Sequence, residues 1–184
     1  MIRLLPLLLL LACAPAEAAV TLVFLSRDFG EVFPHAYVEV TGATDADPGH
    51  PVDANYGFTA TATTPAILLG PVAGEIISVN AVYRRKSLRH FSIRLTDARY
   101  AEVMALVETW RTLPGRSYSL NRRNCVHFVA AVARTIGLSA DDDPALMKKP
   151  RSFLEKVARA NPQIGVEAPA SPEQPIRTPV KAGA

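Results

Sequence analysis

The first half of the chain alternates apolar and polar residues, which is the pattern of half-buried β-strands. Segments 35–42 and 52–60 both alternate in this way, and the polar loop 43–51 lies between them. Two alternating runs joined by one polar loop predict an antiparallel hairpin. In the first run, Ala36, Val38 and Val40 share one face, whereas His35, Tyr37, Glu39 and Thr41 share the other.

Other short runs in this half are also expected to join a sheet. Residues 19–27 are β-branched and apolar, and residues 90–96 alternate, with His90 on a face that should contact solvent. Residues 65–70 and 74–80 are predicted to be short strands or buried turns.

The second half changes to helical spacing. Thr96 is expected to cap a helix that runs to about Thr112, and a second helix should run from about Asn124 to Gly137. Asp143 should cap a short helix, and a last helix is expected over 151–160. Residues 162–184 are rich in Pro and Ala without periodicity, which predicts a disordered tail. We therefore expect one α+β domain over residues 20–161, with an antiparallel sheet packed against helices.

The N-terminal residues 1–19 have the features of a secretory signal peptide. Arg3 precedes the apolar run 4–11, and Ala16-Glu17-Ala18 matches a cleavage site. The apolar run is too short to span a bilayer, and no later stretch is apolar enough to do so. Cys13, at the end of "LLAC", offers a lipoprotein alternative. We expect an exported protein, periplasmic or at the cell surface, that is not transmembrane.

The formal net charge is +3, and the cations gather in segments 83–90, 116–123 and 148–151. Such clusters suit phospholipid headgroups or cell-wall polymers, although an ordinary solvated face explains them more simply. Few aromatic residues are interleaved among the charges, so we expect no nucleic-acid partner. We also expect a monomer.

Cys125 is the one cysteine that would remain after loss or acylation of Cys13. A lone cysteine cannot form an intramolecular disulfide, and no Cys-x-x-Cys or His-x-x-x-His spacing suggests a metal site. We therefore expect no metal and no cofactor. Two interpretations of Cys125 remain: a small buried hydrophobic residue, or a nucleophile.

The predicted position of Cys125 favours a nucleophile. It would stand in the first turn of a helix with Asn124 as N-cap, where the unpaired N–H groups lower a thiol pKa and can hold an oxyanion. His127 follows two residues later, about 200° around the helix, so it cannot act as the base for Cys125.

The base must therefore come from another part of the chain. His35 begins a strand, His50 falls in a loop and should be exposed, and His90 should face solvent. We expect His35 to be the base. Asn55 or, less favoured, Asp53 would orient its ring from the next strand.

Two motifs carry a resemblance to a known family. "NCVHF" (124–128) and the upstream "HAYVEV" (35–40) resemble the circularly permuted branch of the NlpC-type papain-like superfamily, which includes lecithin retinol acyltransferase. The resemblance spans roughly residues 20 to 138. It implies a permuted papain-like fold with the order His35, then Asn55 or Asp53, then Cys125. Those relatives carry a histidine as the third residue, which this chain lacks at both positions.

Tyr118 is also similar to a tyrosine that precedes the cysteine in NlpC-type enzymes, which implies an oxyanion or substrate contact. A place in the core explains it slightly better. Together, these features predict an exported Cys–His thiol hydrolase that acts on an amide bond of cell-wall peptide. The alternatives are a lipid acyl hydrolase or acyltransferase with the same dyad, and a non-catalytic envelope-binding module.

Overall fold

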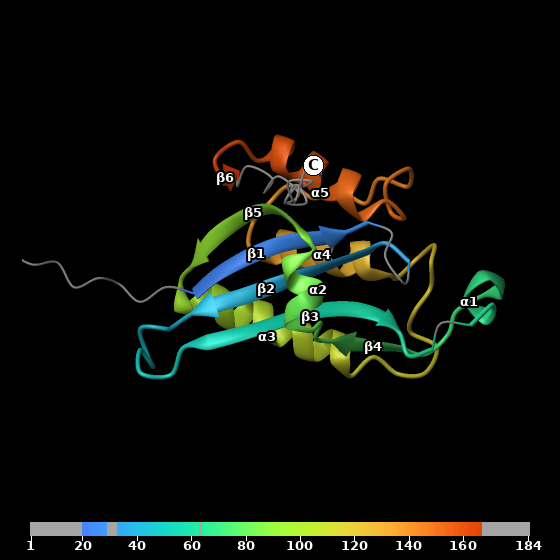
Figure 1. The fold of residues 1–184 in the computed structure, drawn as a ribbon, viewed down its shortest axis with the longest axis horizontal. Helices are drawn as coiled ribbons and strands as arrows, with labels where there is room; N and C mark the ends of the chain where they lie inside the picture. The colour runs from blue at the N-terminus through green and yellow to red at the C-terminus, as the bar shows by residue number, and fades with distance from the viewer. Residues whose placement is uncertain (1–19, 29–32, 63, 167–184) are drawn as a thin grey trace, which may run out of the picture.

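The centre of the protein is an antiparallel sheet with the strand order β4-β3-β2-β1-β5-β6 (Figure 1). The computed structural model describes residues 20–28, 33–62 and 64–166, so the predicted signal peptide lies outside the described residues. The strands are β1 (Val20–Arg27), β2 (His35–Gly42), β3 (Val52–Ala60), β4 (Gly74–Ile77), β5 (Leu88–Leu95) and the two-residue β6 (Gly165–Val166). The predicted α+β class and the β2–β3 hairpin are confirmed.

Helices lie on both faces of the sheet. The helices α3 (Asp97–Arg111), α4 (Cys125–Thr135) and α5 (Pro150–Ala160) pack on one face, and the short α2 (Ala81–Arg85) crosses the other (Figure 1). The four-residue α1 (Ala66–Leu69) protrudes at one end of the molecule. Among the described residues, no helix is long and apolar enough to cross a membrane.

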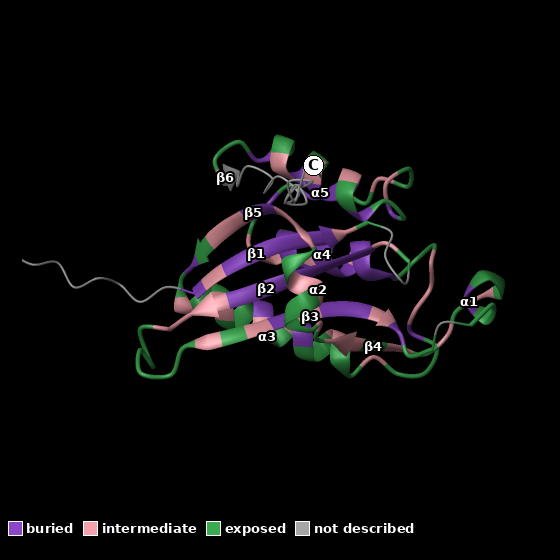
Figure 2. Cartoon of the chain, viewed as in Figure 1, coloured by how far each residue is buried: buried purple, intermediate pink, exposed green. Residues whose placement is uncertain are grey.

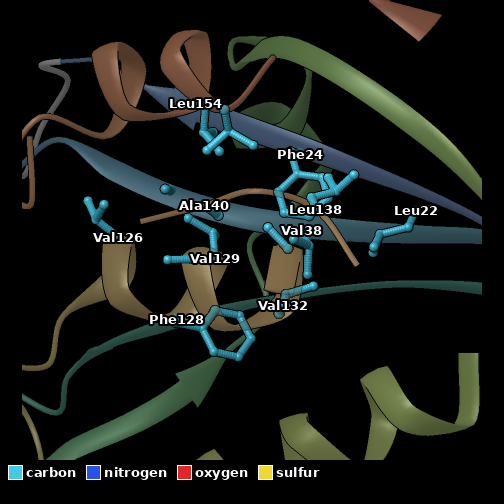
Figure 3. Close-up of a cluster of buried hydrophobic side chains, with 14 of the residues drawn as sticks. Leu22, Phe24, Val38, Val126, Phe128, Val129, Val132, Leu138, Ala140 and Leu154 are labelled. Atoms are coloured by element: carbon cyan, nitrogen blue, oxygen red, sulfur yellow. The ribbon is translucent and has the colours of Figure 1, made fainter. Parts of the chain in front are cut away.

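The main core lies between α4 and the sheet (Figures 2 and 3). Residues spaced three and four apart on α4 point toward the same face, so Val129 and Val132 reach Val38 and the residues around it. Phe128 packs edge-on against Trp110 of α3, with ring centroids 5.3 Å apart. Burial of each such side chain contributes about 1.5–3 kcal/mol, which makes α4 the central helix of the fold.

The second face of β2 is also buried, which strand alternation alone did not predict. Tyr83 of α2 covers Tyr37, with ring centroids 6.1 Å apart. Arg84 of α2 donates to the carboxylate of Glu39 at 2.8 Å, so the buried charge of Glu39 is paired. The short helix α2 therefore closes a face that contains polar side chains.

Four local predictions were wrong. Residues 66–69 form helix rather than a strand or buried turn, and the segment after Asp143 is a turn in which its side chain accepts from Ala145 N–H. His90 does not face solvent, because it is the extra residue of a bulge in β5, between the pairs Phe24–Phe91 and Leu25–Arg89, and its ring lies 2.8 Å from the buried Ser26 Oγ. The predicted tail begins at residue 162, but β6 pairs with β5, so the folded chain extends to residue 166. The rest of that tail lies outside the described residues.

Candidate active site

Asn124 holds the start of α4 in place, as predicted for an N-cap. Its side-chain oxygen accepts from the N–H groups of Val126 at 2.8 Å and His127 at 3.3 Å. Its amide donates to the carbonyl oxygens of Leu120 at 2.8 Å and Met147 at 2.7 Å. The first turn of the helix is therefore tied to two loops that lie on either side of it.

His127 completes this cap, and among the described residues no hydrogen bond joins it to the Cys125 thiol. Its Nδ1 lies 2.9 Å from Asn124 Oδ1 and accepts from Asn124 N–H at 3.3 Å, which forms a capping box. The imidazole is half-buried, and burial lowers its pKa. The histidine nearest to Cys125 in sequence is thus a capping residue. This agrees with the sequence analysis, which placed His127 and Cys125 on opposite sides of the helix.

The Cys125 thiol lies at the first position of α4 and is only 6% exposed. The backbone N–H groups of Ala36, Val126 and Cys125 itself face the sulfur and lower its pKa. Burial has the larger and opposite effect and raises the pKa to about 11. The expectation that the helix terminus would bring this pKa below the ~8.5 of a free thiol was wrong, because desolvation outweighs the N–H groups.

Cys125 opens into a hollow of about 320 Å³. Most of its lining is apolar, and Lys148 is the charged residue in it. The residues that line it are Phe33, Pro34, Tyr118, Leu120, Asn124, Cys125, Val126, Met147, Lys148 and Pro150. The sulfur is therefore almost covered but lies beside a space that is large enough for part of an apolar ligand.

His35 begins β2 and is 9% exposed. Its ring lies parallel to that of Tyr37, 6.2 Å away, and over Gly57 of β3, where a Cβ would collide with Nε2. Among the described residues, Nε2 has no hydrogen-bond partner. Burial lowers the pKa of His35 to about 4, so the ring is neutral at pH 7 and can accept a proton.

The thiol and the imidazole lie near the same end of β2 but on opposite sides of the strand. Ala36 N–H faces the sulfur, whereas the preceding His35 lines a second hollow of about 230 Å³. No hydrogen bond joins the two side chains among the described residues. The two hollows share a wall made by Phe33, Pro34, Tyr118 and Leu120.

Neither candidate for the orienting residue reaches His35. Asn55 lies opposite Glu39 in the β2–β3 register, and its amide bonds Val79 N–H at 2.6 Å and Val79 C=O at 3.1 Å. Asp53 is exposed and pairs with Arg84 at 2.8 Å. Asn55 therefore fixes the chain after β4, and Asp53 belongs to a surface ion pair.

Tyr118 packs against the core and lines both hollows, and its oxyanion or substrate contact stays a prediction. Its ring packs on Phe58 at 5.7 Å, and its backbone forms an isolated bridge with Val72. Burial raises the pKa of Tyr118, and the nearby Cys125 raises it further. The hydroxyl therefore stays protonated at neutral pH.

Sequence reasoning missed Tyr83, which lines the His35 hollow. Burial raises the pKa of the Tyr83 hydroxyl. The guanidinium of Arg27, whose Cζ lies 4.3 Å from the centre of the Tyr83 ring, lowers this pKa, and Cys125 raises it. No signal identified it, because Tyr83 stands in a basic stretch without apolar periodicity. His50, as expected, is exposed, and it contacts Asp47 at 2.7 Å.

Within the described residues, no group of three or more His, Cys, Asp or Glu side chains could hold a metal ion. The reactive groups described at this end of the sheet are a thiol, a neutral imidazole and backbone N–H groups. Comparisons of the chain with models of protein families, with curated proteins and with solved structures find no match.

Proposed function

We propose that the protein is an exported thiol hydrolase of the permuted papain-like type, with Cys125 as nucleophile and His35 as base. The position of the sulfur carries the proposal. It stands at the N-terminus of a central helix, beside an open hollow and against the N–H of Ala36, the neighbour of His35. A thiol that only filled space would not require a helix terminus or an adjoining hollow.

The pKa values define how the pair would act. Because the thiol pKa is about 11 and the imidazole pKa about 4, both groups are neutral at pH 7. His35 would take the thiol proton as sulfur attacks the acyl carbon, rather than hold a preformed ion pair. This transfer requires the imidazole to leave its place over Gly57, since no hydrogen bond joins it to the thiol here.

The remaining steps follow from acyl transfer. Sulfur bonds to the acyl carbon, and the carbonyl oxygen gains the negative charge. The Cys125 N–H can hold it, because groups in the first helical turn have no intrahelical partner. Protonated His35 returns its proton to the departing amine or alcohol as the acyl carbon–heteroatom bond breaks. Water then hydrolyses the thioester and restores the thiol.

The hollow bears on the choice of substrate. The sequence predicts an amide of cell-wall peptide, which is polar. The lining beside Cys125 is mostly apolar, with Lys148 as its one charged residue. This lining favours the second candidate, a lipid acyl ester or amide whose chain fills the hollow and whose anionic group lies near Lys148.

Trapping of the acyl-enzyme tests the proposal. The protein is incubated with a short-chain nitrophenyl ester, a phospholipid or a cell-wall peptide, and the intact mass is measured after acid quenching. We expect an acyl adduct on Cys125 that Cys125→Ala abolishes and His50→Gln, a matched exposed histidine, retains. An adduct that persists in Cys125→Ala would show that Cys125 is not the nucleophile. No adduct with any of the three substrates would leave the non-catalytic envelope-binding module as the better explanation.

A further inference from the structure

Helix α1 exposes large apolar side chains to water. Leu68 and Leu69 are 72% and 90% exposed, and Phe33 nearby is 58% exposed. The surrounding segment 61–74 contains no charged residue. α1 protrudes from one end of the molecule and is exposed over most of its surface (Figures 1 and 2). Exposed apolar groups of this size, gathered on a protrusion, indicate an interaction surface rather than a contribution to the fold.

This apolar surface is continuous with the two hollows. Ile67 of α1 lines the His35 hollow, and Phe33 lines that hollow and the Cys125 hollow. A partner that covered Leu68, Leu69 and Phe33 would therefore meet the mouths of both hollows.

Cations surround the same end of the molecule. Loop 116–123 supplies Tyr118 and Leu120 to both hollows, and the turn before α5 supplies Lys148 to one. Among the described residues, none of the exposed cations on these two segments forms an ion pair with a carboxylate. They are Arg116, Arg122, Arg123, Lys148 and Lys149.

The carboxylates near this end offset the charge only in part. Among the described residues, Asp143 already pairs with Lys156 at 2.8 Å and Asp28 pairs with Arg151 at 3.2 Å, whereas Glu75, exposed on β4, is an opposing charge. The rim is therefore positive around an apolar centre.

We propose that Phe33, Leu68 and Leu69, with the five rim cations, form a surface that docks on an anionic lipid bilayer. The apolar side chains would enter the boundary between headgroups and acyl chains, and the cations would contact anionic headgroups. A second copy of the chain fits less well, because a symmetric contact would bring two positive rims together. The docking surface does not depend on the reactivity of Cys125.

Local fluorescence on the full chain tests the docking. Leu69→Trp places an indole at the tip of α1, and Val82→Trp is a matched control on α2, where the native side chain is 51% exposed. Each variant is mixed with phosphatidylcholine vesicles that contain phosphatidylglycerol and lipids with brominated acyl chains, and emission is compared with that of the wild type. We expect roughly twofold quenching of the added indole at position 69 and none at position 82.

Co-sedimentation with the same vesicles gives a second measurement. We expect Leu68→Ser/Leu69→Ser to bind about tenfold more weakly, and added salt to weaken wild-type binding. Unquenched Leu69→Trp, equal quenching of Val82→Trp or unchanged binding of the double variant would overturn the proposal. So would a dimer in solution that the double variant abolishes, because the surface would then belong to a second copy.

Discussion

The two faces of β2 are both buried, but they are stabilised in different ways. Ala36 and Val38 pack against α4 in an apolar core. On the opposite face, Glu39 pairs with Arg84 at 2.8 Å, whereas Nε2 of His35 lies buried with no partner among the described residues. An unpaired buried polar group costs about 1–3 kcal/mol, so packing alone does not explain His35. The first face is an apolar core, and the second holds His35, the base of the proposed hydrolase.

The largest expected effect is on turnover of an acyl ester or amide. We predict that His35→Gln lowers kcat/KM by about 10²–10⁴-fold, because proton transfer to and from the imidazole is lost. The matched substitution His127→Gln should keep activity close to wild type, since His127 only caps α4. Steady-state kinetics would measure both. Loss of activity in His127→Gln with retention in His35→Gln would reverse the assigned roles.

The next effect contrasts the two faces through stability. We predict that Phe128→Ala lowers the free energy of unfolding by about 3–5 kcal/mol, because it leaves a cavity beside Trp110. His35→Leu should not lower that free energy by more than about 1 kcal/mol, since it removes a polar atom that has no partner and whose burial is unfavourable. Urea unfolding measures both values. A His35→Leu cost as large as that of Phe128→Ala would make His35 a structural residue.

Acid should weaken the fold through the two buried histidines. Burial lowers the pKa of His35 and of His90 to about 4, whereas both would titrate near 6.5 when unfolded. Between these values the unfolded chain binds more protons, so stability is complete above pH 6.5 and falls as the pH drops toward 4. The loss is about 3 kcal/mol for each group. Unfolding at several pH values should show a shallower slope in His35→Gln. An identical slope would contradict the burial.

The smallest expected effect separates Asn55 from Asp53. We predict that Asn55→Ala lowers the free energy of unfolding by about 1–3 kcal/mol, because the backbone of Val79 loses both partners. Asp53→Ala should cost less than about 1 kcal/mol, since its ion pair is exposed. Thermal melts and ester hydrolysis measure both variants, and neither should lose turnover beyond its loss of folded protein. A selective loss of turnover in Asn55→Ala would restore its proposed orienting role.

Patterns over a few neighbouring residues predicted the strands and the helix that hold the candidate site. Alternation predicted β2, β3 and the hairpin between them, because side chains on successive strand residues point to opposite faces. Asn124 predicted the start of α4, since its side chain bonds N–H groups only two and three residues away. Helix geometry also excluded His127 as the partner of Cys125, because residues two apart on a helix point in different directions.

The tertiary structure decided which of these side chains meet. Asn55 bonds Val79 and His90 bonds Ser26 because of strand pairing and a bulge, which no spacing along the chain encodes. Helix α2 closes the second face of β2, although its basic sequence predicts a solvated segment. Burial depends on every element packed around a group. The sequence by itself therefore determined where Cys125 and His35 stand along their helix and strand. Only the packed fold raised the pKa of Cys125, lowered the pKa of His35 and separated the two side chains into adjoining hollows.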